Sequence, residues 1–431
     1  MEQRLRRRLG YVNADRISEL PEALLVHILS LLPTTKHVIV TSVLSKGWRS
    51  LWKMVPRLVF ASPNQKYEDN VISTSLVSHE APVLESLRLR LVRHNYMYMG
   101  DIRAWLGIAF ARHVRELVLD VNFRVSFPGS MFCSASSLET LILKNSIHVD
   151  VPCPVSMKSL KTLHLKDVTY KDDESVRNLL SGCPSLEDLQ VDRGYSIHDA
   201  KIFIIAAPSL KRLSICDPCN GREGGGYVIN APCLKYLEIE MIKGCDFCLI
   251  ENSPELVEAA IRNVSWIVNE TILRSLKPIK RLSLNLSPLE INCPTGTIFY
   301  QLVYLEVYTH KVEWWNLLIL MLDNSPKLQV LKITDCLPCP YYGLVGKKLS
   351  EQEYVPECLL SQLETFVWKN YDWTSEEKKE VATYILRNAI RLKKAYFFIN
   401  RITRKCNELE ERLQMLKELV SNSCHFVSKY E

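Results

Sequence analysis

The sequence predicts an α/β protein in which three N-terminal helices precede an irregular repeat solenoid that ends in a C-terminal α+β cap. Three observations support this architecture. An apolar helical pattern covers residues 15–52, the hexad L-x-x-L-x-L recurs from Leu84 onward, and the pattern changes again after Tyr354. Because one strand with its return segment cannot bury its own apolar face, a recurring hexad predicts that neighbouring units stack around one continuous core.

The N-terminal pattern predicts a first helix that has Ser18 as its cap and stops at Pro33. A second helix should begin at Thr35, and a third should place Trp48 and Trp52 on one stripe. A bundle of about 40 residues rarely buries this much apolar surface alone, so the rest of this chain or another polypeptide should cover it. The apolar positions are Leu20, Leu24, Leu25, Ile28, Leu29, Leu32, Val38, Ile39, Val43, Leu44, Trp48, Leu51 and Trp52.

The composition, 47% hydrophobic and 24% charged, is that of an ordinary globular protein. No apolar run approaches the ~18 residues of a membrane span and the N-terminus lacks a signal-peptide core, so we expect a cytoplasmic or nuclear protein without membrane partners. Residues 1–13 carry clustered arginines and should form a basic disordered tail, with nuclear import or nucleic-acid contact as the alternative. Elsewhere lysines alternate with acids under a net charge of +6, which argues against nucleic-acid binding.

The 14 cysteines, in a chain without a secretory signal, should be reduced and mostly buried. Two of the three Cys-x-x-Cys pairs lie about 25 residues apart, which is longer than the spacing of ~15–20 residues in a zinc ribbon. We therefore expect no metal and no other cofactor. The pairs are Cys216 with Cys219, Cys245 with Cys248, and Cys336 with Cys339.

A connector is expected over residues 57–81, with a polar patch and a short helix, and repeats are expected over residues 82–353. The hexads recur about every 22 to 26 residues, within the range of leucine-rich repeats. Residues 221–226 lack the lysine and the following helix of a phosphate loop and should be a flexible insertion. The hexads begin at Leu84, Val114, Leu138, Leu160, Leu186, Leu210, Leu234, Leu256, Ile279, Leu302 and Leu328, with helical return segments at residues 101–112, 172–180 and 314–322.

Within each hexad, the alternation of a strand sends the fourth and sixth side chains inward and leaves the third and fifth on the concave face. These outer positions mix both charges with aromatic residues, and no catalytic set converges among them. Such a surface suits a protein or peptide partner better than a polyanion. The expected target-binding residues are Arg88, Glu116, Thr140, His164, Asp188, Gln190, Arg212, Tyr236, Glu238, Arg281, Tyr304, Glu306 and Lys332.

Residues 354–424 should form the α+β cap that closes the end of the stack. Leu363, Phe366 and Trp368 predict a strand, and Thr374 or Ser375 should cap a helix with an acidic first turn. A further strand is expected at residues 394–399, followed by an amphipathic helix at residues 407–420.

The N-terminal run DRISELPEALLVHILSLLPT, followed by TSVLSKGWRSLW, resembles a plant-type F-box. The resemblance implies that residues 14–56 bind a small Skp-type adaptor that bridges to a cullin-RING ubiquitin ligase. Gly47 departs from the family, which usually carries Arg or Lys there, and a glycine in a helical turn costs roughly 0.5 to 1 kcal/mol. The residues with an implied role in adaptor binding are Leu20, Pro21, Leu24, Ile28, Leu29, Leu32, Pro33, Val43, Leu44, Trp48, Leu51 and Trp52.

The later chain resembles the rest of the same family. Lead-ins such as CPSLE at residues 183–187 are similar to the repeats that follow plant F-boxes, and VPECLLSQLE with YILRNAIRLKK resembles the FBD domain, with Trp373 in place of a common glycine. This resemblance to F-box/FBD/LRR proteins implies a non-enzymatic substrate-recognition subunit of an SCF-type ubiquitin ligase, whose repeats hold a target protein.

Three alternatives compete with that function. An adaptor-bound scaffold outside proteolysis and a receptor that senses a small ligand both stay open. A hydrolase that uses His113, His164 or Cys183 is disfavoured, because the sequence has no nucleophile and general base at the spacing of a recognisable catalytic motif.

Overall fold

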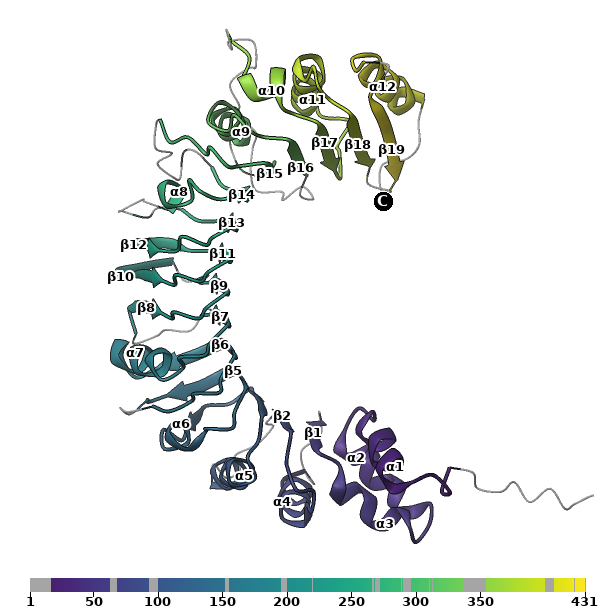
Figure 1. The fold of residues 1–431 in the computed structure, drawn as a ribbon, viewed down its shortest axis with the longest axis vertical. Coiled ribbons are helices and arrows are strands. Elements are labelled where there is room, and N and C mark those ends of the chain that lie inside the picture. The colour runs from purple at the N-terminus through teal and green to yellow at the C-terminus, as the bar shows by residue number, and fades with distance from the viewer. Residues whose placement is uncertain are drawn as a thin grey trace, which may run out of the picture. The chain divides into compact units, whose positions relative to one another are not determined.

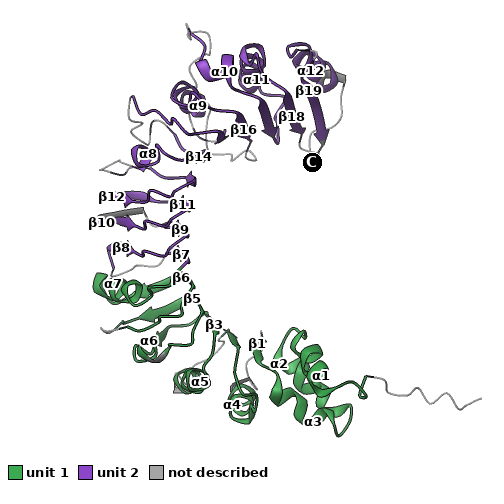
Figure 2. Ribbon diagram, viewed as in Figure 1, with its two compact units in different colours: residues 1–186 green, residues 187–431 purple. Residues whose placement is uncertain are grey.

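The chain forms two compact units, residues 1–186 and residues 187–431, each built from helices and parallel strands (Figures 1 and 2). The basic tail expected over residues 1–13 lies outside the described residues. The computed structural model describes residues 17–62, 68–92, 100–151, 155–194, 200–218, 220–265, 267, 272–287, 289, 296–309, 311, 313–335, 354–399, 407–421 and 423–430.

The first unit opens with helices α1 (Glu22–Ser30), α2 (Thr35–Val40) and α3 (Trp48–Leu51), with 3-10 turns at Thr41–Val43 and Trp52–Met54. Their shared core consists of Leu25, Leu29, Val38, Trp48, Leu51 and Val55.

The expectation that Ser18 caps α1 is wrong. The helix begins after Pro21, which makes no side-chain cap bond. The Ser18 hydroxyl instead accepts a hydrogen bond from Trp48 Nε1 at 2.7 Å. This bond joins the segment before α1 to α3, so Ser18 contributes to tertiary packing and leaves the helix end uncapped.

The sheet of the first unit is parallel, and the helices α4 to α7 lie along one of its faces (Figure 1). The first strand, β1, was not predicted. It packs on α2, and Val59 N donates a hydrogen bond to Thr35 Oγ1 at 2.7 Å. The strand order is β1 (Arg57–Ser62), β2 (Ser86–Leu91), β3 (Glu116–Val121), β5 (Thr140–Val149) and β6 (Thr162–Tyr170). A short strand, β4 (Val125–Phe127), pairs with β5. The helices are α4 (Glu68–Ser78), α5 (Gly100–Ala111), α6 (Met131–Ser134) and α7 (Asp173–Ser181).

A buried histidine links the N-terminal helices to the first strands. His79, which follows α4, is 1% exposed. Its Nε2 lies 3.0 Å from the carbonyl oxygen of Val55, and its Nδ1 lies 3.0 Å from Nη1 of Arg112. Since the guanidinium can only donate, the geometry requires a neutral ring that donates through Nε2. Burial lowers the pKa of His79, and the nearby Arg112 lowers it further.

The second unit holds one long parallel sheet and a second, three-stranded sheet of order β12-β10-β8. The long sheet consists of β7 (Asp188–Asp192), β9 (Arg212–Cys216), β11 (Tyr236–Glu240), β13 (Glu258–Arg262), β14 (Arg281–Asn285), β15 (Tyr304–Tyr308), β16 (Val330–Thr334), β17 (Thr365–Lys369), β18 (Lys394–Ile399) and β19 (His425–Tyr430). The strands of the second sheet are β8 (Ile202–Ala206), β10 (Asn220–Asn230) and β12 (Lys243–Asn252). The helices are α8 (Ile272–Ser275), α9 (Trp314–Asp323), α10 (Glu357–Ser361), α11 (Glu376–Asn388) and α12 (Asn407–Glu418).

Every hexad forms a strand that begins at its third residue, as the alternation of L-x-x-L-x-L predicts. In β9, for example, Leu213 and Ile215 are fully buried and pair in register with Leu237 and Ile239 of β11. The stacked leucines and isoleucines form the core, and the residues between them lie on the opposite face, which we call the open face. Figure 1 shows helices α9 to α12 on the core side of β15 to β19.

The expectation that residues 221–226 form a flexible insertion is wrong, because they belong to β10. A Cβ on Gly226 would lie 2.3 Å from the carbonyl oxygen of Phe247, so only glycine lets β10 approach β12 this closely. The sheet is also held to the repeats by a buried polar cluster, in which the Tyr227 hydroxyl donates to Asp217 Oδ2 at 2.5 Å and Arg193 Nη1 lies 3.5 Å from the same oxygen.

The C-terminal elements largely match the sequence pattern. Strands β17 and β18 and helices α11 and α12 form where they were expected, and Ser375 caps α11 by accepting a hydrogen bond from Lys378 N at 3.4 Å. Their core is aromatic, with Trp314 of α9 packed edge-on against Trp368 of β17 at 6.3 Å. Helix α10 and the last strand, β19, were not predicted.

Candidate functional site

The N-terminal helices expose an apolar stripe that the described part of the chain does not cover. On α1, Leu25 and Leu29 point into the core, whereas Leu24 is 50% exposed and Ile28 is 41% exposed. Leu31, one turn further along, is 71% exposed. Monomeric proteins rarely expose such a stripe without a binding role. We call the exposed apolar residues of these helices the docking face: Leu24, Ile28, Leu31, Val40, Val43 and Leu44.

Not every residue expected to bind an adaptor lies on the docking face. Leu29, Trp48 and Leu51 are buried in the core, so of the two roles that the resemblance implies, binding an adaptor or supporting its binding, they can take only the supporting one. Leu20, Leu32 and Trp52 are partly buried against the same core, while Pro21 and Pro33 are exposed at the two ends of α1.

Sequence reasoning missed Leu31 and Val40, which are both more than half exposed. The signal was present, since Leu24, Ile28 and Leu31 recur at the i, i+4, i+7 spacing of one helix face. Helix α1 carries a second apolar face beside it, on which Leu25 and Leu29 lie. Only packing decides which of the two faces becomes the interior.

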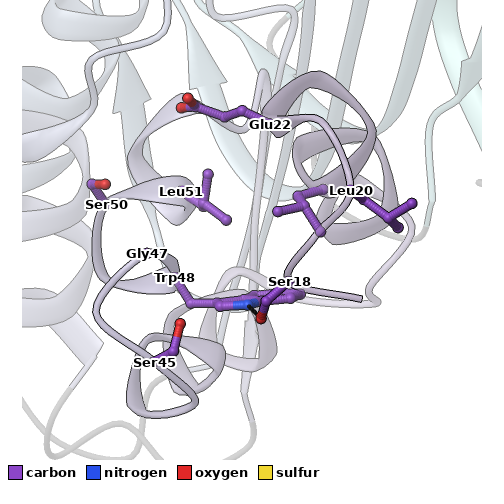
Figure 3. Close-up of a pocket in the computed structure, with 9 residues that line it drawn as sticks. Ser18, Leu20, Glu22, Ser45, Gly47, Trp48, Ser50 and Leu51 are labelled. Atoms are coloured by element: carbon purple, nitrogen blue, oxygen red, sulfur yellow. Dashed lines mark hydrogen bonds between the residues drawn. The ribbon is translucent and has the colours of Figure 1, made fainter. Parts of the chain in front are cut away.

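A pocket of about 300 Å³ lies between the segment before α1 and the loop before α3 (Figure 3). Ser18, Leu20 and Trp48 line it, and Gly47 borders it. A Cβ on Gly47 would meet only Ser45 Oγ, at 3.8 Å, and the backbone there has φ −67° and ψ −30°. Neither space nor backbone conformation therefore requires a glycine at the position where the resemblance expects Arg or Lys.

The open face of the first unit carries sparse, paired charges. Arg88 of β2 donates to Glu116 of β3 at 2.6 Å, and Arg88 is exposed while Glu116 is half-buried. Thr140 of β5 lies in register with Glu116, and His164 of the adjacent strand β6 lies in register with Ile142. These predicted positions thus share one face.

The open face of the second unit carries a row in which the order acid, arginine, tyrosine occurs twice. Asp188, Arg212 and Tyr236 pair in register on β7, β9 and β11, and the same order returns as Glu258, Arg281 and Tyr304 on β13 to β15. The guanidinium of Arg281 lies 4.0 Å from the ring centre of Tyr304, and that of Arg212 lies 5.2 Å from Tyr236. Such contacts orient an arginine on an aromatic platform.

The adjacent row of the second unit includes Gln190, Glu238, Glu306 and Lys332. Glu238 forms an ion pair with Arg262. Glu306, which was expected to contact a target, is only 8% exposed, because it pairs with Lys332 at 2.7 Å and accepts from Thr334 at 2.9 Å. Glu306 therefore has little surface left for a partner.

The tyrosine hydroxyls of this face stay protonated near neutral pH. Burial raises the pKa of Tyr304 to about 12, and the carboxylate of Glu306 adds to the shift. Burial also raises the pKa of Tyr236 and of Tyr308. Each of these phenols can therefore act as a hydrogen-bond donor to a partner.

Among the described residues, no group of three or more His, Cys, Asp and Glu side chains is placed to hold a metal ion. Cys245 and Cys248 are buried in β12, where burial raises the pKa of Cys245 to about 11, so these thiols are protonated. Cys219, Cys336 and Cys339 lie outside the described residues. No helix of the described segments combines the length and the apolarity that crossing a membrane requires.

Of the residues weighed as hydrolase groups, Cys183 is 1% exposed and donates through Sγ to the carbonyl oxygen of Leu179 at 3.1 Å. Burial raises its pKa to about 12. Its sulfur is therefore a buried thiol rather than an accessible thiolate.

Three protein-family models match segments of the chain. The F-box domain model matches residues 17–60, a model of the LRR repeats of FBD-associated F-box protein At5g56370 matches residues 102–257, and the FBD model matches residues 351–397.

Full-length relatives carry the same three features in their names. F-box/FBD/LRR-repeat protein At3g52680 of Arabidopsis thaliana is 55% identical over 97% of this chain and 94% of its own length. F-box/FBD/LRR-repeat protein At4g00160 of the same plant is 53% identical over 97% of this chain and 95% of its own length. The resemblance inferred from the sequence is confirmed, and the chain belongs to the F-box/FBD/LRR-repeat protein family.

Proposed function

We propose that this F-box protein is the substrate-recognition subunit of an SCF-type ubiquitin ligase. Residues 14–56 bind a Skp-type adaptor, residues 57–81 connect, residues 82–353 form a leucine-rich-repeat solenoid that holds a target protein, and residues 354–424 cap it. The single observation that carries the proposal is the docking face, whose α1 stripe of Leu24, Ile28 and Leu31 is left exposed in the described part of the chain.

The adaptor binds because the docking face gains free energy when it is covered. Full burial of a leucine or isoleucine side chain stabilises by roughly 1.5 to 3 kcal/mol. The core residues behind the face, Leu29 and Leu51, hold α1 and α3 in place, so the partner meets a preformed surface and little ordering entropy opposes binding.

The open faces of the two units bind the target. Arginine, tyrosine and carboxylate side chains, several already oriented by neighbours, offer donors, acceptors and apolar area without a fixed sign of charge. Arginine and tyrosine are the residues most often found at the energetic centres of protein interfaces. Catalysis then requires no reactive group in this chain, because holding a target lysine near a charged conjugating enzyme raises its effective concentration.

Co-purification with a Skp-type adaptor tests the proposal. Leu24→Asp combined with Ile28→Asp should reduce recovery of the complex at least about tenfold, since charges replace apolar contacts. The matched control is Val77→Asp on α4, because Val77 is also exposed, at 71%, but lies outside the docking face. Undiminished recovery of the adaptor with the α1 variant, or an equal loss with Val77→Asp, would contradict the proposed docking.

A further inference from the structure

The open face changes its chemistry at the C-terminal end of the long sheet. On β18 and β19 it consists of Lys394, Tyr396, Phe398, His425, Val427 and Lys429, which we call the cap face. Lys394 pairs in register with His425, Tyr396 with Val427, and Phe398 with Lys429. The cap face contains no acid, whereas the rows on β11 to β15 carry several glutamates.

The lysines of the cap face differ from those nearby. Lys393 is neutralised by Glu364 at 2.6 Å, and Lys332 by Glu306 at 2.7 Å. Lys394 and Lys429 are both exposed, and within the part of the chain that the structure describes neither side chain has an ion pair or a hydrogen bond. Among the described residues, therefore, no acid pairs with either of these two positive charges.

An apolar strip separates these two charges. The rings of Tyr396 and Phe398 stack at 6.4 Å between centres with an angle of 17°, and both are half-buried beside Val427. Lys429 lies in register with Phe398, four residues along the strand from Lys394, which corresponds to about 13 Å at a rise of ~3.3 Å per residue. The surface thus presents positive, apolar and positive zones in sequence.

We propose that the cap face binds a short extended segment of the target protein whose one face carries an acidic, an apolar and a second acidic side chain. In an extended chain the residues i, i+2 and i+4 share one face, so the complementary pattern is acid-x-apolar-x-acid. The inference rests on the proposed function, because it names the class of target that the subunit presents.

A protein segment fits this surface better than a nucleic acid. Binding to nucleic acid scales with the number of phosphates neutralised, and the cap face supplies only two lysines, Lys394 and Lys429. A peptide instead gains from burying its apolar side chain on the aromatic strip as well as from its two carboxylates.

Fluorescence anisotropy with the full-length chain, purified with its adaptor, tests the inference. The probe is a labelled peptide that contains Glu-Ser-Phe-Ser-Glu, and the control peptide carries the scrambled order Glu-Glu-Ser-Ser-Phe. Lys394→Gln combined with Lys429→Gln should weaken binding of the probe about three- to thirtyfold. The matched control is Arg387→Gln combined with Lys417→Gln, which changes the net charge equally on the exposed surface of α11 and α12 and should leave affinity within about twofold.

Several outcomes would overturn the inference. Equal binding of the two peptides, or equal loss with the two pairs of variants, would show only non-specific charge attraction, and tighter binding of a single-stranded oligothymidylate would assign the face to nucleic acid. Phe398→Ser gives an independent check, since it should weaken the probe while leaving the charge and the adaptor unchanged. If the adaptor co-purifies but the peptides are not distinguished, this inference alone fails. If the adaptor never co-purifies, the proposed function fails instead.

Discussion

Replacing Gly47 by alanine should stabilise the protein by about 0.4 to 1 kcal/mol. The backbone of Gly47 already lies in the right-handed helical region that any L-residue adopts, and an added Cβ meets only Ser45 Oγ at 3.8 Å. The methyl group therefore causes no clash in the folded state, while it removes conformations from the unfolded chain. Because Trp48 and Leu51 of the adjoining α3 belong to the core, the gain should appear in cooperative unfolding.

Urea unfolding monitored by tryptophan fluorescence measures this gain. The matched control is Gly224→Ala, because a Cβ there also has nothing within 4 Å but the backbone φ is +75°. That control should lose about 1 kcal/mol, since L-residues are strained in this region. If Gly47→Ala were less stable than the wild type, the backbone would require glycine there and the reasoning from space and conformation would be refuted.

The same position should affect the adaptor. Gly47→Arg introduces a residue that the F-box resemblance expects there and preorganises α3, so affinity for a Skp-type adaptor should rise about two- to fivefold, as measured by calorimetric titration. A fall in affinity would show instead that the pocket beside Gly47 has to stay open for a side chain of the adaptor.

Three further predictions concern stability. Gly226→Ala should cost about 3 kcal/mol in urea unfolding, because its Cβ would overlap the carbonyl oxygen of Phe247, and a neutral result would mean that β10 and β12 can separate. Tyr227→Phe should cost about 1 to 3 kcal/mol by removing a hydroxyl donor from buried Asp217, whereas a stabilised variant would show that the cluster is dispensable. His79 contributes stability that is present above its ordinary pKa of about 6.5 and is lost as pH falls through its lowered folded pKa. The wild-type protein should therefore lose more stability in acid than the His79→Gln variant does. Parallel pH profiles of the two free energies of unfolding would contradict this.

The sequence predicted the elements whose apolar residues follow one period. The repeat strands could be placed because L-x-x-L-x-L specifies both the strand and its buried side, and α11 could be placed because Ser375 and the acidic turn mark its start. The second sheet could not, because a glycine-rich segment has no periodicity of its own and forms β10 only between β8 and β12. Strand β19 lacks the hexad and is a strand because β18 pairs with it. Strand β1 follows a degenerate hexad, Val55-x-x-Leu58-x-Phe60, which was overlooked because it comes directly after the third helix.

For the candidate site, the sequence predicted which helices carry the docking face but not which side of α1 it occupies. The side is decided by Trp48 and the chain around Val55, which lie far along the sequence and pack on Leu25 and Leu29. Likewise, the pattern assigned Glu306 to the open face, but its burial depends on Lys332 one strand further along the sheet.

The duplicated order of acid, arginine and tyrosine gives the second unit an internal molecular ruler. Neighbouring strands lie about 4.8 Å apart, so equivalent members of the two triplets, such as Arg212 and Arg281, recur about 14 Å apart across three strands. A ligand with a repeated motif could therefore engage both triplets at once and gain avidity. Insertion of one whole repeat between β11 and β13 would leave every strand able to pair, yet it would put the two triplets out of phase.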